Sequence, residues 1–132
     1  MSENKEKKQK LRGFAKILSE QLAPLNENEK FREKYKDADM KILLNATDGR
    51  YAALIKVKDG SIEVEGIKNK KENLKREILG WDGKLETKTQ IFFDLAMGKL
   101  STLSIIGKLI TRKIKIKNMK KVMMLTELFQ FF

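Results

Sequence analysis

The acidic side chains are the first place to look for chemistry, because the 132-residue chain contains no cysteine and no histidine. That absence removes disulfides, thiolate nucleophiles, imidazole bases and the usual zinc ligands. Two carboxylate pairs, Asp82 with Glu86 and Asp94 with Glu127, would suit general acid–base work if the fold brought them into one cleft. Nothing in the sequence places them together. We therefore expect a non-enzyme with no metal site and no cofactor.

Basic residues form the second chemical group, since 29 Lys and Arg outnumber 18 Asp and Glu and give a formal net charge of +11. Such a surplus favours nucleic acid, an anionic membrane surface or a phosphate-bearing ligand. Nucleic acid is disfavoured, because the sequence has no recognition-helix motif, zinc knuckle or aromatic stacking motif. The candidates for contact with an anionic head group or membrane are Lys113, Lys115, Lys117, Lys120 and Lys121. The alternative interpretation is a solvated edge strand with outward lysines.

The length of the chain predicts one domain, over residues 10–132, preceded by a flexible charged N-terminus over residues 1–9. No apolar run approaches the ~18 residues of a membrane-spanning helix. The N-terminal residues have no apolar core and do not resemble a secretory signal. These features predict a cytoplasmic protein.

Two Asp-Gly pairs, at residues 48–49 and 59–60, organise the middle of the sequence. Asp-Gly between alternating apolar residues is the strongest short-range signal for a hairpin with a type I′ turn. We therefore predict a three-stranded antiparallel meander over residues 40–67 with one apolar face. The predicted pairs on that face are Met40 with Val57, Ile42 with Ile55, Leu44 with Ala53, Ala46 with Tyr51, Val57 with Ile62, and Ile55 with Val64.

Two helices before the meander are expected to cover the sheet. Residues 10–22 place their apolar side chains in one stripe, and Pro24 ends that helix. Asn26, with Glu29 three residues later, has the pattern of an N-cap in a capping box. A short helix to about Lys36 follows.

After the meander, residues 74–81 favour a short helix, and its Trp81 fits a partial core plug better than a ligand-stacking residue. Residues 84–88 favour a fourth strand. Thr89 is positioned to cap a helix that runs to Met97, and Gly98 is positioned to end it in the left-handed conformation.

The last third of the chain carries more apolar surface than one sheet face needs. Ser101 is positioned to cap another apolar helix, and residues 113–117 alternate Lys and Ile as an edge strand does. The final helix, residues 119–132, is apolar on all sides and must be buried on most of them. Either mutual packing and a dimer interface cover this surplus, or it lines an apolar cavity or groove that holds a ligand.

The order of these elements, together with Phe92 to Leu100 and Ile114 to Asn118, resembles the sterol carrier protein type 2 (nonspecific lipid-transfer) family over about residues 10–132. The resemblance implies an α+β fold with a five-stranded mixed sheet, one face of which about five helices cover around an apolar tunnel. Members often have glycine where Arg112 and Asn118 stand. Asparagine tolerates the left-handed conformation, whereas arginine does so less readily.

The resemblance also implies non-catalytic binding, and transfer, of a fatty acid, acyl-CoA, sterol or isoprenoid-like lipid. The expected walls of the lipid site are Phe92, Leu95, Leu100, Leu103 and Ile106. The expected lid residues on the last helix are Met119, Met123, Met124 and Leu128. The alternative is a structural module, a monomer or weak homodimer, whose last helix docks on a partner or a second copy.

Overall fold

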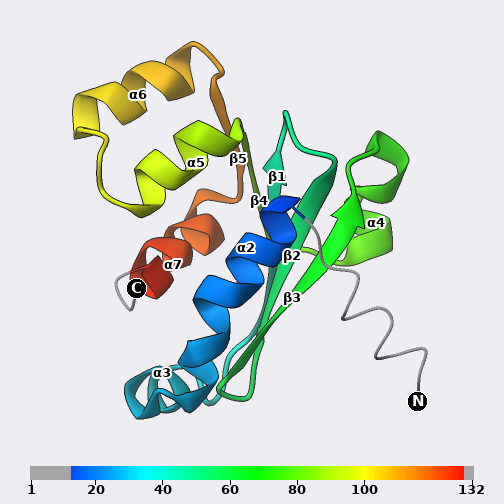
Figure 1. Cartoon of the computed structure of the whole chain (residues 1–132), viewed down its shortest axis with the longest axis vertical. Coiled ribbons are helices and arrows are strands. Elements are labelled where there is room, and N and C mark those ends of the chain that lie inside the picture. Colours follow the sequence, from blue (N-terminus) through cyan, green and yellow to red (C-terminus); the bar gives the residue numbers. More distant parts are fainter. Residues whose placement is uncertain (1–12, 130–132) are drawn as a thin grey trace.

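The computed structural model describes residues 13–129, apart from the side chains of Phe14, Ala96 and residues 125–129 (Figure 1). Residues 1–9, expected to be flexible, and residues 130–132 of the expected last helix lie outside this range. The α-helices are α2 (Gly13–Leu22), α3 (Glu29–Lys34), α4 (Arg76–Leu79), α5 (Thr89–Ala96), α6 (Thr102–Ile110) and α7 (Met119–Phe129). The 3-10 helices are η1 (Ala23–Glu27) and η2 (Lys71–Asn73).

One sheet contains the five strands β1 (Asp39–Ala46), β2 (Tyr51–Lys58), β3 (Ser61–Lys68), β4 (Gly83–Thr87) and β5 (Ile114–Lys117). Their order across the sheet is β3-β2-β1-β4-β5, so β3 and β5 are the edges. β1 and β4 run parallel, and the other neighbours are antiparallel. The predicted α+β fold with a mixed five-stranded sheet is confirmed.

The register of the meander is as predicted. Ile55 of β2 lies between Ile42 of β1 and Val64 of β3, and the pairs Met40 with Val57, Leu44 with Ala53 and Val57 with Ile62 follow the same register. Asp59 and Gly60 have φ values of 52° and 77°, both in the left-handed region. A type I′ turn requires that geometry, so the second Asp-Gly turn is confirmed.

The first Asp-Gly turn was predicted wrongly. Asp48 and Gly49 both lie outside the left-handed region, and the regular ladder between β1 and β2 ends at Leu44 and Ala53. The backbone NH of Gly49 donates to the carbonyl of Ala46, so the turn spans residues 46–49 and begins at the last residue of β1. Within this turn the NH of Thr47 donates to the carbonyl of Thr87 on the neighbouring strand β4.

The capping residue of α3 also differs from the prediction. Asn28, rather than Asn26, accepts a hydrogen bond from the backbone NH of Phe31 with its side chain. The Asn26 amide instead binds both backbone groups of Ile62, at 2.7 and 3.0 Å. Ile62 lies on edge strand β3, whose outward backbone groups need partners. The side chain of Asn26 satisfies that edge and is therefore not available to cap the helix.

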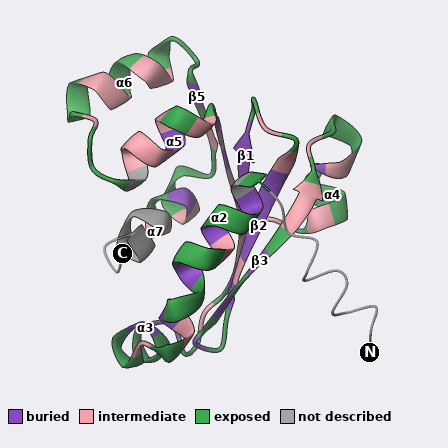
Figure 2. Cartoon of the chain, in the orientation of Figure 1, coloured by how far each residue is buried: buried purple, intermediate pink, exposed green. Residues whose placement is uncertain are grey.

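The main core lies between one face of the sheet and α2, α3, α5 and α7 (Figure 2). α6 has no buried residue and adds only the partly buried Leu109. α2 packs on β2 and β3, and α7 packs on β4 and β5. A smaller cluster on the opposite face joins Leu43 and Leu54 to Leu74 beneath η2 and α4. Trp81 packs against that cluster and donates its indole NH to the carbonyl of Leu74, which is the structural role that the sequence favoured.

The residues that cap and end α5 and α6 agree with the prediction in part. Gly98, with φ of 70°, ends α5 as predicted, and the Ser101 hydroxyl caps α6 by accepting from the NH of Ser104. Thr89 does not cap α5, because Lys88 occupies the N-cap position. Arg112 and Asn118 both adopt the left-handed conformation, with φ of 62° and 60°. The turns that flank β5 therefore keep the geometry that glycine would supply more easily.

Candidate functional site

The main core is incompletely covered at the end formed by α5, α6, β5 and α7. Seven apolar residues among those described are partly buried and pack against this core. Apart from Ala38, they all lie at this end, and we call them the apolar margin: Ile91, Phe93, Leu95, Leu109, Ile116 and Met124. By contrast, the core residues of α2, β1 and β2 have almost no exposed surface.

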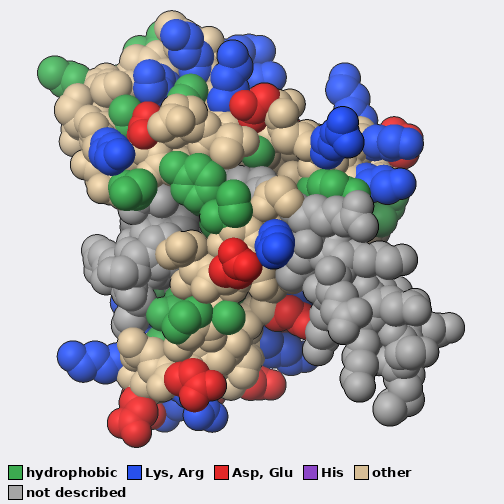
Figure 3. Space-filling model, viewed as in Figure 1, with side chains coloured by type: hydrophobic (Ala, Val, Ile, Leu, Met, Phe, Trp, Pro, Cys, Tyr) green, Lys and Arg blue, Asp and Glu red, His purple; other side chains and the backbone are tan. Residues whose placement is uncertain are grey.

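Apolar side chains also reach the surface of the same helices. Of the eight large apolar side chains that are exposed in the described part of the chain, six lie in or beside α5, α6 and α7. They are Met97, Leu103, Ile106, Ile110, Met119 and Met123. Figure 3 shows apolar side chains at the surface where α5 and α6 lie in Figure 1, with Lys and Arg side chains across the top of the molecule.

The predicted lipid-contact residues fall into separate groups. Those in the core or its margin are Phe92, Leu95 and Met124, and Phe92 is 2% exposed. Leu100 is partly buried. The exposed ones are Leu103, Ile106, Met119 and Met123, and Leu103 reaches 81% exposure. Leu128 lies in α7, but its side chain is outside the described set. The structure thus places Phe92, Leu95 and Met124 in the main core or against it, and leaves the exposed residues outside that core.

The predicted lysine cluster is divided as well. Lys113 and Lys115 line a pocket of about 500 Å³, together with Lys88 and Arg112. We call this the basic pocket; its other lining residues are Thr47, Glu86, Thr87 and Ile91. Lys117 and Lys120 are exposed and do not line the pocket. Lys121 is partly buried, with its Cβ close to Gly83 where α7 packs on β4. Sequence reasoning missed Lys88 and Arg112. Arg112 directly precedes Lys113 in the chain, whereas Lys88 comes close to them only because β5 pairs with β4.

Asp48 is a further residue that the sequence interpretation missed. Its carboxylate accepts from the backbone NH and from the hydroxyl of Thr89, both at 2.9 Å, and so satisfies the start of α5 from a different part of the chain. These two hydrogen bonds hold the pKa of Asp48 below its ordinary value of 3.8, and the nearby charge of Lys88 acts in the same direction. The sequence analysis interpreted Asp48 only as part of an Asp-Gly turn, although an aspartate there could also accept hydrogen bonds from the start of a helix.

The candidate acid–base residues have structural partners. Asp82 accepts the backbone NH of Lys41 at 2.9 Å. Glu86 accepts from the amide of Asn45 at 3.0 Å and lies 3.6 Å from the ammonium of Lys84. Asp94 accepts from the Gln90 amide within α5, and the side chain of Glu127 is outside the described set. No group of three or more carboxylates in the described residues could hold a metal ion.

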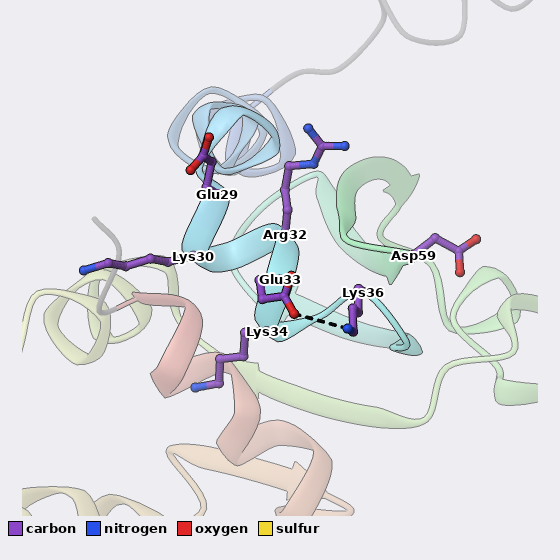
Figure 4. A pocket seen from close by; sticks show the side chains of 7 residues that line it. All are labelled: Glu29, Lys30, Arg32, Glu33, Lys34, Lys36 and Asp59. Atoms are coloured by element: carbon purple, nitrogen blue, oxygen red, sulfur yellow. Dashed lines mark ion pairs between the residues drawn. The ribbon is translucent and has the colours of Figure 1, made fainter.

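A larger hollow of about 820 Å³ lies at the opposite end, between α3 and the turn after β2 (Figure 4). Its lining side chains are charged and exposed, with both signs present. In Figure 4 they point in several directions from α3, from the residues after it and from the turn after β2, and they do not converge on a common centre. Glu33 pairs with Lys36 at 3.2 Å. This hollow has neither the apolar lining of a lipid site nor the uniform charge of an anion site.

No helix in the described residues is long and apolar enough to cross a membrane. No family model matches the chain, and no curated protein matches it significantly. Solved structures do match its fold. The UbiJ-SCP2 ubiquinone synthesis protein superposes with a TM-score of 0.59 at 6% identity, over 89% of this chain and 93% of that one. A conserved protein from Thermus thermophilus, described as a candidate sterol carrier protein, superposes with a TM-score of 0.50 at 16% identity, over 82% and 73%.

A third similar structure is the inverting sec-alkylsulfatase Pisa1 from Pseudomonas sp., with a TM-score of 0.57 at 15% identity. It is matched over 86% of this chain but only 15% of its own, so the likeness concerns a small part of that enzyme. Together these matches define the fold as sterol-carrier-like. At such low identities the likeness concerns the fold alone.

Proposed function

We propose that this chain binds and carries a lipid or fatty acyl ligand without catalysing a reaction on it. The apolar part of the ligand would lie against the apolar margin, between the sheet and α5, α6 and α7. The observation that carries the proposal is the concentration of partly buried core residues at that one end. Covering such a surface with an acyl chain is favourable by ~0.8 kcal/mol per buried methylene.

The sterol-carrier-like fold supports the same ligand class. One solved neighbour is named for ubiquinone synthesis and another is described as a candidate sterol carrier. Ubiquinone and sterols are both largely apolar molecules. For this chain we propose a fatty acid, acyl-CoA, sterol or isoprenoid-like lipid as the ligand.

The carboxylates support a binding role rather than a catalytic one. Asp82 and Glu86 are held by hydrogen bonds that organise the sheet, so neither faces a substrate with an unpartnered carboxylate. A general acid or base needs hydrogen-bond reach to a reacting group in a cleft. Glu86 lines the basic pocket, but its carboxylate is engaged by Asn45 and Lys84, which do not line it.

A second candidate function is interaction with a partner through the exposed side chains of α6 and α7. Leu103, Ile106 and Ile110 fall within about 60° of one another on the wheel of α6, at the helical period. All three are exposed, as are Met119 and Met123 of α7. A net charge of +11 opposes close association of two copies, so a monomer or weak homodimer is expected.

Native mass spectrometry of the purified protein tests the lipid proposal directly. We expect a stoichiometric adduct of lipid mass that is released on denaturation and identified after organic extraction. If the protein is recovered without an adduct, a fluorescent fatty acid is added and then displaced with oleate. Absence of saturable, displaceable binding would contradict the carrier function and leave the interaction module.

Two neighbouring methionines of α7 provide a matched pair for the site. Met124 belongs to the apolar margin, whereas Met123 is 52% exposed. We expect Met124→Gln to weaken binding of the fluorescent fatty acid about fivefold or more, because the amide would be desolvated by the ligand. Met123→Gln should leave the affinity within about twofold. Equal effects of the two substitutions would contradict the proposed position of the ligand.

A further inference from the structure

We propose that the basic pocket binds a negatively charged group, a phosphate, diphosphate or carboxylate, and that Arg112 is its principal ligand. This rests on the proposed function in one respect, namely that the anion is the head group of the carried lipid. The pocket lies where β4 leads into α5 and where α6 leads into β5. Its volume of about 500 Å³ is ample for such a group.

The charges that line the pocket favour an anion. Four of its described lining residues are cationic: Lys88, Arg112, Lys113 and Lys115. Within the described part of the chain none of the four lies within ion-pair distance of a carboxylate, although Lys88 is near enough to Asp48 to affect its pKa. The one acidic lining residue, Glu86, is engaged by Asn45 and Lys84. An arriving anion would therefore meet cations whose charge is largely uncompensated.

The backbone at Arg112 supplies an independent observation. α5 and α6 both end in a Schellman motif, in which two backbone NH groups beyond the helix donate to the carbonyls of its last turn. After α5, the backbone NH of Lys99 donates to the carbonyl of Asp94, and the backbone NH of Gly98 donates to the carbonyl of Leu95. The left-handed residue there is Gly98, for which the conformation carries no steric cost.

After α6, the backbone NH of Lys113 donates to the carbonyl of Lys108, and the backbone NH of Arg112 donates to the carbonyl of Leu109. The left-handed residue of this motif is Arg112, with φ of 62°. A side chain in that conformation is strained, and strained residues persist where the surroundings hold them and often mark functional sites. Glycine would suit this turn better, so the turn alone gives no reason for an arginine here. What arginine adds is its guanidinium group. Its planar set of donors suits a phosphate or carboxylate.

The pocket and the apolar margin share one residue, Ile91. Ile91, on the first turn of α5, lines the pocket and also packs against the main core. An amphiphilic molecule could place its charged end among the cations and extend its tail past Ile91 toward Leu95 and Met124. The ligand class that fits both surfaces is an acyl or isoprenoid-like chain with an anionic head.

The test is Arg112→Gly, which removes the charge and gives the turn its preferred residue. We expect the full-length variant to have a higher melting temperature and to bind inorganic pyrophosphate at least about fivefold more weakly, measured by titration calorimetry at low ionic strength. Lys58→Gln is the control, because it removes one charge from the end of β2, far along the sheet from the pocket. Equal weakening by both variants, or no weakening by Arg112→Gly, would overturn the proposal.

Oleate and oleyl alcohol, which share a chain and differ in charge, separate this proposal from the carrier function. We expect Arg112→Gly to weaken oleate binding and leave oleyl alcohol unaffected. If both ligands bind the variant with the same affinity as they bind the unchanged protein, the carrier function stands and the anion site is wrong. If neither binds while pyrophosphate binding depends on Arg112, the anion site stands as a site for free phosphates and the carrier function is wrong.

Discussion

The half of the sheet formed by β1, β2 and β3 is covered more completely than the half formed by β4 and β5. Ala15 and Leu18 of α2, Phe31 of α3 and Ile55 of β2 are each at most 1% exposed. At the other end, six residues of α5, α6, β5 and α7 are only partly buried against the same core. Other large side chains there face outward, and Ile110 is 76% exposed.

The difference assigns separate tasks to the two regions. Close packing of apolar side chains supplies most of the free energy of folding, and a missing methyl group in such a region is costly. Regions with fewer buried contacts open more readily, and ligand-binding elements are drawn from them. The meander with α2 and α3 therefore serves as the stable base, and α5, α6 and α7 form the less completely buried region, which we propose admits the ligand.

The largest difference between the regions should come from truncating apolar side chains. We expect Ile55→Ala, at a fully buried site on the interior strand β2, to lower the free energy of unfolding by about 2–5 kcal/mol in urea titrations. Leu103→Ala, at an exposed site on α6, should change it by less than about 0.5 kcal/mol. A comparable loss from Leu103→Ala would show that α6 is packed in solution and would remove the contrast.

Two glycines give a sharper comparison of the regions. Gly60 has φ of 77°, and a Cβ added there would lie 2.9 Å from the carbonyl oxygen of Arg32. Gly98 has φ of 70°, and a Cβ there would meet nothing within 4 Å. We expect Gly60→Ala to cost about 2–3 kcal/mol, from backbone strain and steric overlap, and Gly98→Ala only about 1 kcal/mol. Equal losses in urea unfolding would indicate that the space around Gly98 is filled.

A smaller effect should come from the bond that ties the first hairpin to α5. Asp48→Ala removes the acceptor of two hydrogen bonds from Thr89, and we expect a loss of up to about 1 kcal/mol near neutral pH. The pKa of Asp48 is lowered in the folded state, so its contribution is present well above pH 3.8 and is lost as the pH falls through the lowered pKa. The stability gap between Asp48→Ala and the unchanged protein should therefore close with acid, in urea titrations at several pH values. A gap that persists unchanged at acidic pH would contradict this role of Asp48.

Patterns that are local in the sequence predicted much of the fold. Alternation fixed the register of β1, β2 and β3, and the left-handed residues at Gly60 and Gly98 followed from the conformational freedom of glycine. The failures involve partners distant in the chain. Asn26 satisfies the edge of β3 rather than its own helix, and Asp48 serves α5 rather than its own turn.

The site was harder to predict for a related reason. Apolar residues of α5, α6 and α7 have the same composition whether they face the core, a ligand or water, so Leu95 and Leu103 could not be told apart. The basic pocket depends on the meeting of Lys88 with Arg112, which are 24 positions apart in the sequence. Alternation between Lys and Ile predicted edge strand β5 but could not indicate which lysines would share a pocket.

Hydrogen exchange measured by mass spectrometry, with and without oleate below its micellar concentration, tests the central claim most directly. We expect slower exchange in α5 and α7, with the smallest change in the backbone amides of β1, β2 and β3. If the apolar margin alone binds the hydrocarbon tail, a matched titration with oleyl alcohol would give the same pattern of slowed exchange. Protection confined to α2 and α3, or none in α5 and α7 at saturating oleate, would contradict the assignment of this end of the molecule as the lipid site.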